Sequence, residues 1–152
     1  MLLSKSCVYG LRATLLLASY QNGGYTSIKD LSNKLDISFH FLTKILQQLT
    51  AAELLESMKG PKGGVRLSGE SSDITLREVV IAIDGPDIFT ECVLGLPGCG
   101  SEKPCPMHAM WAETRDDIEQ MLQTTSLEDM SKEGMEQDLR ITADGHFVWG
   151  EP

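Results

Sequence analysis

The chain has 152 residues, enough for one compact domain with a substantial core or for a small domain with an appendage. The N-terminal stretch, residues 1–21, is apolar, but Arg12 interrupts it. Its longest uninterrupted apolar run is too short for a membrane span and lacks the layout of a signal peptide, and no other segment is long or apolar enough to cross a bilayer. We therefore expect a cytoplasmic protein with no membrane partner.

The net charge of −9 at pH 7 hides a strong asymmetry along the chain. Residues 1–68 hold eight basic and four acidic residues, whereas residues 69–152 hold five basic and eighteen acidic ones. Such a split indicates that the two halves face different partners. The basic half could contact phosphates, which would repel the acidic half.

The basic half predicts three helices. Apolar residues at helical spacing predict the first over residues 6–20, ended by the Gly-rich cluster at 22–24. Ser27 begins a capping-box-like start to a short second helix. After a turn at residues 36–38, with Ser38 as a candidate N-cap, a third helix is predicted over residues 39–55. Its buried stripe is expected to be Leu42, Ile45, Leu46 and Leu49.

The segment after the third helix predicts a β-hairpin whose turn is residues 60–64, Gly-Pro-Lys-Gly-Gly. Two short helices joined by a turn are common, and a basic hairpin alone favours an ordinary solvated turn. In this order, however, they are typical of a winged helix, whose third helix enters the major groove of DNA while the hairpin reaches the backbone or the minor groove. The predicted DNA-contacting residues are Ser38, Phe39, His40, Thr43, Lys44, Gln47, Lys59, Lys62 and Arg66.

The acidic half predicts two more helices and a tail. The first begins after Ser72 or Asp73 and breaks at residues 85–86. After a loop over about 90–105, Pro106 suits the first turn of another helix. Its apolar stripe is long enough that we expect a partner subunit to cover it. The tail is expected to be weakly ordered, with Phe147 and Trp149 as docking residues. The stripe comprises Met107, Met110, Trp111, Ile118, Met121 and Leu122.

Three of the four cysteines lie in the stretch ECVLGLPGCGSEKPCPMHAMW, residues 91–111. Six residues separate Cys92 from Cys99, five separate Cys99 from Cys105, and His108 follows three positions later. Since disulfides rarely persist in the cytoplasm, the grouping indicates metal or redox chemistry. The spacings are looser than in most zinc sites, and three thiolates with one imidazole also suit a [2Fe–2S] cluster. Spacing alone leaves zinc, iron–sulfur and unliganded thiols open.

The sequence resembles the iron–sulfur cluster-binding winged-helix transcription regulators typified by IscR and NsrR, over about residues 1–130. The resemblance rests on LSKSCVYGLRATLLLA, ISFHFLTKILQQLTAAELLES, KGPKGGVRLS, ITLREVVIAIDG and the ending CPMHAMW. It implies a homodimer in which the helix from about 106 to 124 crosses its partner. It also implies that Cys92, Cys99 and Cys105 bind a cluster, with [2Fe–2S] favoured and [4Fe–4S] as the alternative.

The resemblance also bears on the fourth ligand. In IscR-like members it is a histidine three residues after the last cysteine, which matches His108. In NsrR-like members it is a carboxylate near the start of the partner's first helix, but residues 6–9 here contain no acid. Cys7 stays open as a ligand from the partner chain, although a small buried thiol is its expected role. The first cysteine spacing is one residue longer than is usual in the family, which bears on the cluster type.

We therefore predict a mainly α fold with a small β-hairpin wing. A winged helix-turn-helix DNA-binding domain is expected over residues 1–68, a cluster-binding loop with dimerisation helices over 69–130, and a C-terminal tail over 131–152. The predicted function is a dimeric, non-enzymatic transcription regulator that binds a near-palindromic DNA site. Its cluster would sense redox state, iron–sulfur status or nitric oxide and control DNA affinity. The alternatives are the same fold with a structural zinc, or an iron–sulfur redox protein that does not bind DNA.

Overall fold

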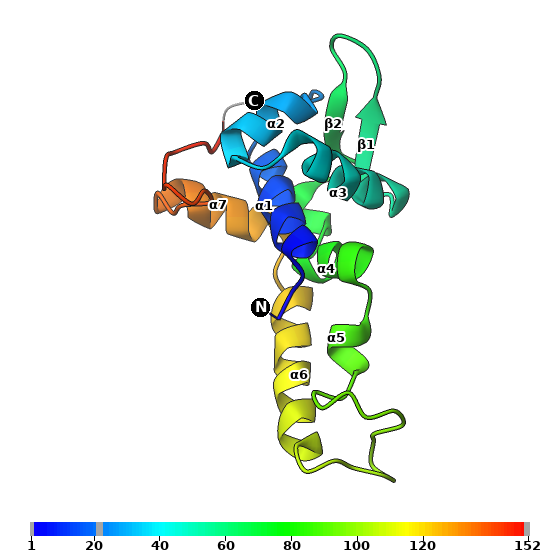
Figure 1. The fold of residues 1–152 in the computed structure, drawn as a ribbon. Helices are drawn as coiled ribbons and strands as arrows, with labels where there is room; N and C mark the ends of the chain where they lie inside the picture. Colours follow the sequence, from blue (N-terminus) through cyan, green and yellow to red (C-terminus); the bar gives the residue numbers. More distant parts are fainter. Residues whose placement is uncertain (1, 21–22, 151–152) are drawn as a thin grey trace.

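The computed structural model describes residues 2–20 and 23–150. Figure 1 shows a helical head from which α6 extends as an arm with α5 beside it, and the cysteine loop lies at the far end of that arm, away from the β-hairpin. Within the described residues, no helix combines the length and apolarity needed to span a membrane. In chain order the elements are α1 (Lys5–Ser19), α2 (Ile28–Leu35), α3 (Phe39–Ala51), β1 (Leu55–Met58), β2 (Gly64–Leu67), η1 (Ser71–Asp73), α4 (Leu76–Asp84), α5 (Asp87–Thr90), α6 (His108–Gln123) and α7 (Leu127–Glu136).

The first three helices pack through their apolar stripes, and the four predicted core residues of α3 are all buried. Ser27 caps α2 by accepting a hydrogen bond from the backbone N–H of Asp30. Ser38 occupies the N-cap position of α3 but makes no side-chain capping bond. α3 ends at Ala51, earlier than predicted, because Glu53 adopts a left-handed conformation (φ 62°) and the chain then enters β1.

The predicted wing is an antiparallel hairpin in which Leu55 lies opposite Leu67 and Met58 opposite Gly64. Val65 also exchanges two backbone hydrogen bonds with Thr26, of 2.8 and 2.9 Å, which ties the wing to the segment before α2. Gly64 permits this approach, since its φ is +149° and an added Cβ would lie 2.0 Å from the Thr26 carbonyl oxygen. The wing is thereby fixed beside α3.

The start of α4 differs from the prediction. Residues Ser71–Asp73 form the short 3-10 helix η1, and Thr75 caps α4 in a reciprocal capping box with Glu78. Ser72 and Asp73 are therefore wrong as caps, because the Thr75–Glu78 pair satisfies two backbone N–H groups at once. A short helix that was not predicted, α5, follows the break at residues 85–86 and leads into the cysteine loop.

The predicted apolar stripe of α6 divides between two faces of the helix. Leu122 is buried in a small cluster with residues of α1, α4 and α5, and Ile118 packs against that cluster. Trp111 hydrogen-bonds to the start of the cysteine loop. On the other face, Met110 and Met121 are 71% and 57% exposed. The chain's own α1, α4 and α5 cover Leu122, whereas Trp111 and Ile118 are half-buried, so part of the predicted stripe stays open to a partner subunit.

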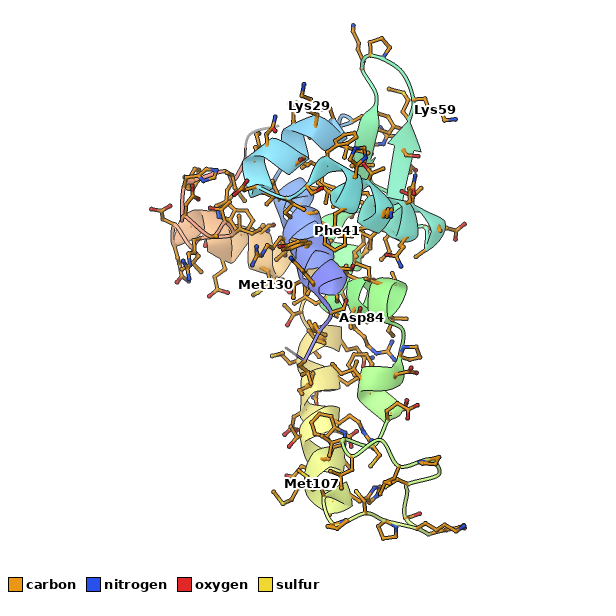
Figure 2. The ribbon with its side chains drawn as sticks, viewed as in Figure 1. Lys29, Phe41, Lys59, Asp84, Met107 and Met130 are labelled. Carbon is orange, nitrogen blue, oxygen red and sulfur yellow. The ribbon has the colours of Figure 1, made fainter. Side chains whose placement is uncertain are left out.

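Two smaller details of the arm also differ from the prediction. The first helical residue of α6 is His108, so Pro106 lies just before the helix and not in its first turn. Met107, at the N-cap position and labelled in Figure 2, is 40% exposed beside the loop.

The C-terminal segment is docked against the head, where α7 packs along α1 (Figure 1). Trp149 is 5% exposed, and its indole lies over Gly134, where an added Cβ would meet the ring at 2.5 Å. The backbone N–H of Gly150 donates to Oγ of Ser19. Docking of Trp149 is confirmed, whereas Phe147 is exposed and the expected weak order of the tail is wrong for this segment.

Candidate metal centre and nucleic-acid interface

One surface of the head combines α3 and the wing. Residues 38–40 are exposed at the N-terminal end of α3. A groove of about 640 Å³ runs between the outer face of α3 and the hairpin. The structure therefore brings together two sets of residues that the sequence predicted separately. The predicted contact residues that line this groove are Phe39, Thr43, Gln47 and Lys59.

The wing's charges are arranged unequally. Lys59 and Lys62 are exposed on the hairpin. Arg66, in contrast, is paired with Glu56, with its Nη2 atom 2.9 Å from the carboxylate, and its guanidinium lies 4.4 Å from the centre of the Tyr25 ring. The hairpin was predicted to be basic, but it also carries Glu56, which lies directly opposite Arg66 in the register. A phosphate would therefore have to compete with the Glu56 carboxylate for the Arg66 guanidinium.

Lys29, which was not predicted from the sequence, lines the same groove from the first turn of α2. Figure 2 labels Lys29 and Lys59 on the head near the wing. A cation in the first turn of a helix is electrostatically unfavourable, because the helix dipole is positive there. An external phosphate beside Lys29 would offset this repulsion. A lysine at such an unfavourable position was therefore the sequence signal that could have pointed to an anion contact.

The cysteine loop is folded by a series of four-residue hydrogen-bonded turns. The N–H of Gly95 donates to the carbonyl of Cys92 at 2.9 Å, and the N–H of Cys99 donates to that of Leu96 at 3.4 Å. The N–H of His108 donates to the carbonyl of Cys105 at 3.0 Å. Each predicted ligand thus begins or ends a turn, and this geometry bends the chain back on itself.

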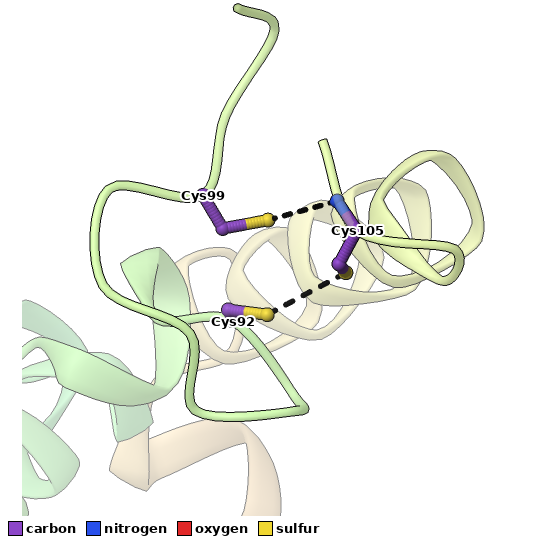
Figure 3. Close-up of side chains that lie close together, drawn as sticks. All are labelled: Cys92, Cys99 and Cys105. Carbon is purple, nitrogen blue, oxygen red and sulfur yellow. Dashed lines mark hydrogen bonds between the residues drawn. The ribbon is translucent and has the colours of Figure 1, made fainter. Parts of the chain in front are cut away.

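The three loop thiols converge at the end of the arm (Figure 3). Their Sγ atoms all lie within 4.8 Å of one another. Sγ of Cys92 is 3.5 Å from Sγ of Cys105, and Sγ of Cys99 accepts a hydrogen bond of 3.3 Å from the backbone N–H of Cys105. In the described part of the chain, no other group of three or more His, Cys, Asp or Glu ligand atoms comes together in this way.

His108 lies at the edge of this thiol group. Its Nδ1 atom is 3.7 Å from Sγ of Cys99, and the side chain is half-buried. The first residue of α6 therefore offers a nitrogen donor beside Sγ of Cys99, although His108 is not part of the group whose ligand atoms all lie within 4.8 Å. Soft thiolates with one imidazole are donors suited to an iron–sulfur cluster or to zinc.

The thiols differ in acidity. Hydrogen bonding from the backbone of Leu96 is the main cause that lowers the pKa of Cys92 to about 7. The pKa of Cys99 is raised, because burial and the neighbouring thiols outweigh the lowering effect of the Cys105 backbone N–H. The group therefore holds one thiol that ionises near neutral pH, as metal binding requires.

Cys7 has the opposite environment. It is fully buried in the cluster that contains Val80 and Phe89. Burial raises its pKa to about 12, and the nearby Asp84 carboxylate adds to the effect. This is the small buried thiol that was expected, and the high pKa disfavours Cys7 as a ligand to a partner's metal.

Two side chains of α6 that were not singled out from the sequence hold the start of the loop. The indole N–H of Trp111 donates to the Glu91 carbonyl at 2.9 Å. Nη1 of Arg115 lies 3.1 Å from the carbonyl oxygens of both Thr90 and Glu91. The sequence offered no signal for these contacts, since they depend on how α5 packs against α6.

The helix pair, the exposed α3 and the adjoining wing define a winged-helix transcription regulator. The model of the Rrf2 family, described as iron-dependent transcriptional regulators, matches residues 3–133. The chain therefore belongs to the Rrf2 family.

Individual relatives agree with this assignment. The transcriptional regulator IscR of Photorhabdus laumondii is 32% identical over 122 residues, which cover 80% of this chain and 74% of that protein. The structure of CymR, the global cysteine regulator of Bacillus subtilis, matches with a TM-score of 0.74 at 28% identity, over 86% of this chain and 96% of that one. The T. potens IscR structure matches with a TM-score of 0.71 at 25% identity, over 89% of each chain. The predicted resemblance to IscR-type regulators is confirmed.

Proposed function

We propose that this Rrf2 regulator binds DNA as a homodimer and that an iron–sulfur cluster sets its DNA affinity. The ligands would be Cys92, Cys99, Cys105 and His108. The observation that carries the proposal is the convergence of three thiols within 4.8 Å, with the His108 imidazole 3.7 Å from one of them. This donor set fits a [2Fe–2S] cluster with mixed Cys and His ligands, and [4Fe–4S] is the alternative. When bound, such a cluster supplies a redox-active centre that is sensitive to oxidants and to iron supply.

The arm connects the cysteine loop to the proposed DNA-binding head, so a change in the loop can affect the position of α3. His108 is both a proposed ligand and the first residue of α6, so ligation would fix the start of the arm. The other end of α6 is anchored by Leu122 in the cluster shared with α1, α4 and α5. α1 and α4 in turn pack against α3. Order in the loop can therefore bias the position of the recognition helix without any contact between loop and DNA.

Homodimerisation is supported by the uncovered face of the arm. Met110 and Met121 are exposed on α6, three helical turns apart, and a second copy of the arm would bury them. A two-fold dimer places two α3 helices in successive major grooves, so we expect a near-palindromic site with half-sites roughly 34–36 Å apart. A cytoplasmic location fits four free cysteines.

On the head, the DNA contacts are proposed to come from α3 and the wing. His40, Thr43, Lys44 and Gln47 would approach the base edges or the adjacent backbone. Lys59 and Lys62 would contact phosphates, and Arg66 would do so in competition with Glu56.

A structural zinc ion is the second candidate, because the sulfur atoms lie close enough together to bind a single ion. A tetrahedral zinc ion with Zn–S bonds of about 2.3 Å holds its thiolates roughly 3.8 Å apart. The distance of 3.5 Å between Sγ of Cys92 and Sγ of Cys105 is close to that value. In this case the metal would stabilise the loop without sensing, and DNA affinity would not respond to oxidants.

Anaerobic purification followed by visible absorbance and by iron, sulfide and zinc analysis tests the proposal. We expect a coloured protein containing iron and sulfide in equal amounts. Cys92→Ala, Cys99→Ala and Cys105→Ala should each lose the colour, whereas the control Cys7→Ala should keep it. A colourless wild-type protein that contains one zinc ion per chain would establish the second candidate instead.

A further inference from the structure

Arg115 has a place in the arm that the proposed ligand set does not explain. It lies on the same face of α6 as His108 and Trp111, at intervals of seven and four residues. Its Nη1 atom is 3.1 Å from the carbonyl oxygens of Thr90 and Glu91, the last residue and the C-cap of α5. The Glu91 carbonyl therefore accepts hydrogen bonds from two side chains of α6, because the Trp111 indole also donates to it.

Arg115 is half-buried where α6 packs against α5. Nε of Arg115 is buried and has no hydrogen-bond partner among the described residues. Burying part of a charged group with an unsatisfied N–H is unfavourable, and such groups in native structures call for an explanation. The two bonds from Nη1 are the contacts that hold Arg115 in this position.

These contacts act on Cys92 through the geometry of the peptide bond. The carbonyl of Glu91 and the nitrogen of Cys92 belong to one planar peptide unit, so fixing that oxygen fixes the plane from which Cys92 emerges. Sγ of Cys92 then lies 3.5 Å from Sγ of Cys105. At the other end of the loop, Cys105 is held by the turn that opens α6. Without Arg115, only the Trp111 indole would hold this peptide plane, and the Thr90 carbonyl would lose its contact with α6.

We propose that Arg115, assisted by Trp111, is a positioning residue that clamps the Thr90–Glu91 backbone and aims Cys92 at the other ligands. The clamp keeps the first end of the loop attached to α6 whether or not the other thiols are ligated. Its effect on cluster retention rests on the proposed function, but its effect on the loop backbone does not.

The test compares Arg115→Met, which keeps the side-chain length but removes the donors, with Arg140→Met as a matched control. Arg140 also donates to a backbone carbonyl, that of Ala143, but lies in the tail. The first readout is hydrogen exchange in cluster-free protein at the amides of Glu91 and Gly95, which are bonded to Asp87 and Cys92. We expect exchange about tenfold faster in Arg115→Met than in wild type. Arg140→Met should match wild type.

The second readout is the rate at which the anaerobically purified protein loses its visible absorbance in the presence of a chelator. The starting spectrum of Arg115→Met should equal that of wild type, because the ligands are unchanged, but the loss should be about tenfold faster. Arg115→Lys, which can reach one carbonyl, should fall between the two. Trp111→Phe should show a smaller effect of the same sign.

Two results would overturn the clamp. One is wild-type exchange at Glu91 and Gly95 in a folded Arg115→Met protein. The other is an equal rise in exchange at the buried amides of α3, which would mean that Arg115 only stabilises the fold as a whole. If wild-type protein carries no chromophore, the proposed cluster fails, and the exchange data in cluster-free protein still decide the role of Arg115.

Discussion

Nδ1 of His108 lies 3.7 Å from Sγ of Cys99, although the two residues are nine positions apart in the sequence. The contact joins the middle of the cysteine loop to the first residue of α6. One side chain thus belongs both to the proposed metal site and to the arm that leads to the head. If His108 is a ligand as proposed, a change in its ligation would act directly on the start of that arm.

Replacing His108 by alanine should alter the cluster without removing it. The three thiolates remain, and loss of the imidazole should shift the visible spectrum and lower the reduction potential, because histidine ligation raises it. Absorbance spectroscopy and redox titration under anaerobic conditions measure both effects. His40→Ala, on α3, serves as the control and should keep the wild-type spectrum. A wild-type spectrum and potential in His108→Ala would show that another group is the fourth ligand.

The pKa values predict selective alkylation in cluster-free, reduced protein. The thiolate is the reactive form, and the pKa of Cys92 is lowered to about 7, so its reaction with iodoacetamide should rise as the pH increases through about 7. Below that pH the thiol is protonated and the rate falls. Cys7, with a pKa raised to about 12 and a buried side chain, should stay unmodified under the same conditions. Mass spectrometry of peptides gives both rates, and equal labelling of Cys7 and Cys92 contradicts the described environments.

Lys62→Ala should weaken DNA binding about equally for all sequences. A lysine on the wing contributes one phosphate contact, so its removal should also reduce the slope of log affinity against log salt by about one unit. Fluorescence anisotropy at several salt concentrations measures both. Lys103→Ala, on the cysteine loop, is the control and should leave both unchanged.

The same titrations separate wing contacts from base contacts. Gln47→Ala should change the ranking of DNA sequences, by about 1–3 kcal/mol per lost base contact, with little change in the salt slope. If Lys62→Ala leaves affinity and salt slope as in wild type, the wing does not dock on DNA as proposed.

Met121→Lys should shift the protein from dimer to monomer. The side chain is 57% exposed on the arm, so a charge there should not disturb the fold of one chain but should oppose burial against a second. Sedimentation velocity gives the oligomeric state. Leu139→Lys, at an exposed apolar residue of the tail, should leave the dimer intact. A persistent Met121→Lys dimer means that the two copies meet through another surface.

Trp149→Ala should destabilise the head by about 3–5 kcal/mol, as is typical for a large core aromatic. Its ring is 5% exposed and fills the space above Gly134. The control Phe147→Ala, 58% exposed, should change stability by less than about 0.5 kcal/mol. Urea unfolding of cluster-free protein supplies the comparison. Equal stability of the two variants contradicts the described docking of the tail.

Locally determined features could be predicted from the sequence. The buried stripe of α3 follows from helical spacing, and the wing follows from residues 60–64, whose turn chemistry is local. The convergence of Cys92, Cys99 and Cys105 was suggested by their grouping, but the choice of His108 depended on the resemblance to known regulators. The spacing alone favoured neither zinc nor an iron–sulfur cluster decisively.

Features that depend on long-range packing could not be predicted. Periodicity identified the apolar residues of α6 but not which neighbour covers each side, so Ile118 and Leu122 were expected against a partner. The pairing of Arg66 with Glu56 depends on strand register, and the clamp by Arg115 depends on where α5 ends. In each case the contact depends on another helix or strand, whose position relative to the residue is fixed only when the chain folds.

The most direct test of the account is the DNA affinity of one preparation measured with and without its cluster. DNA selected from a random pool by the anaerobic wild-type protein would be titrated with cluster-loaded protein and with the same protein after chelation. The account predicts a change in affinity of about 5–150-fold, the usual range of coupling between two sites, and no such change in Cys92→Ala. Equal affinities for the loaded and cluster-free forms of wild-type protein would contradict it.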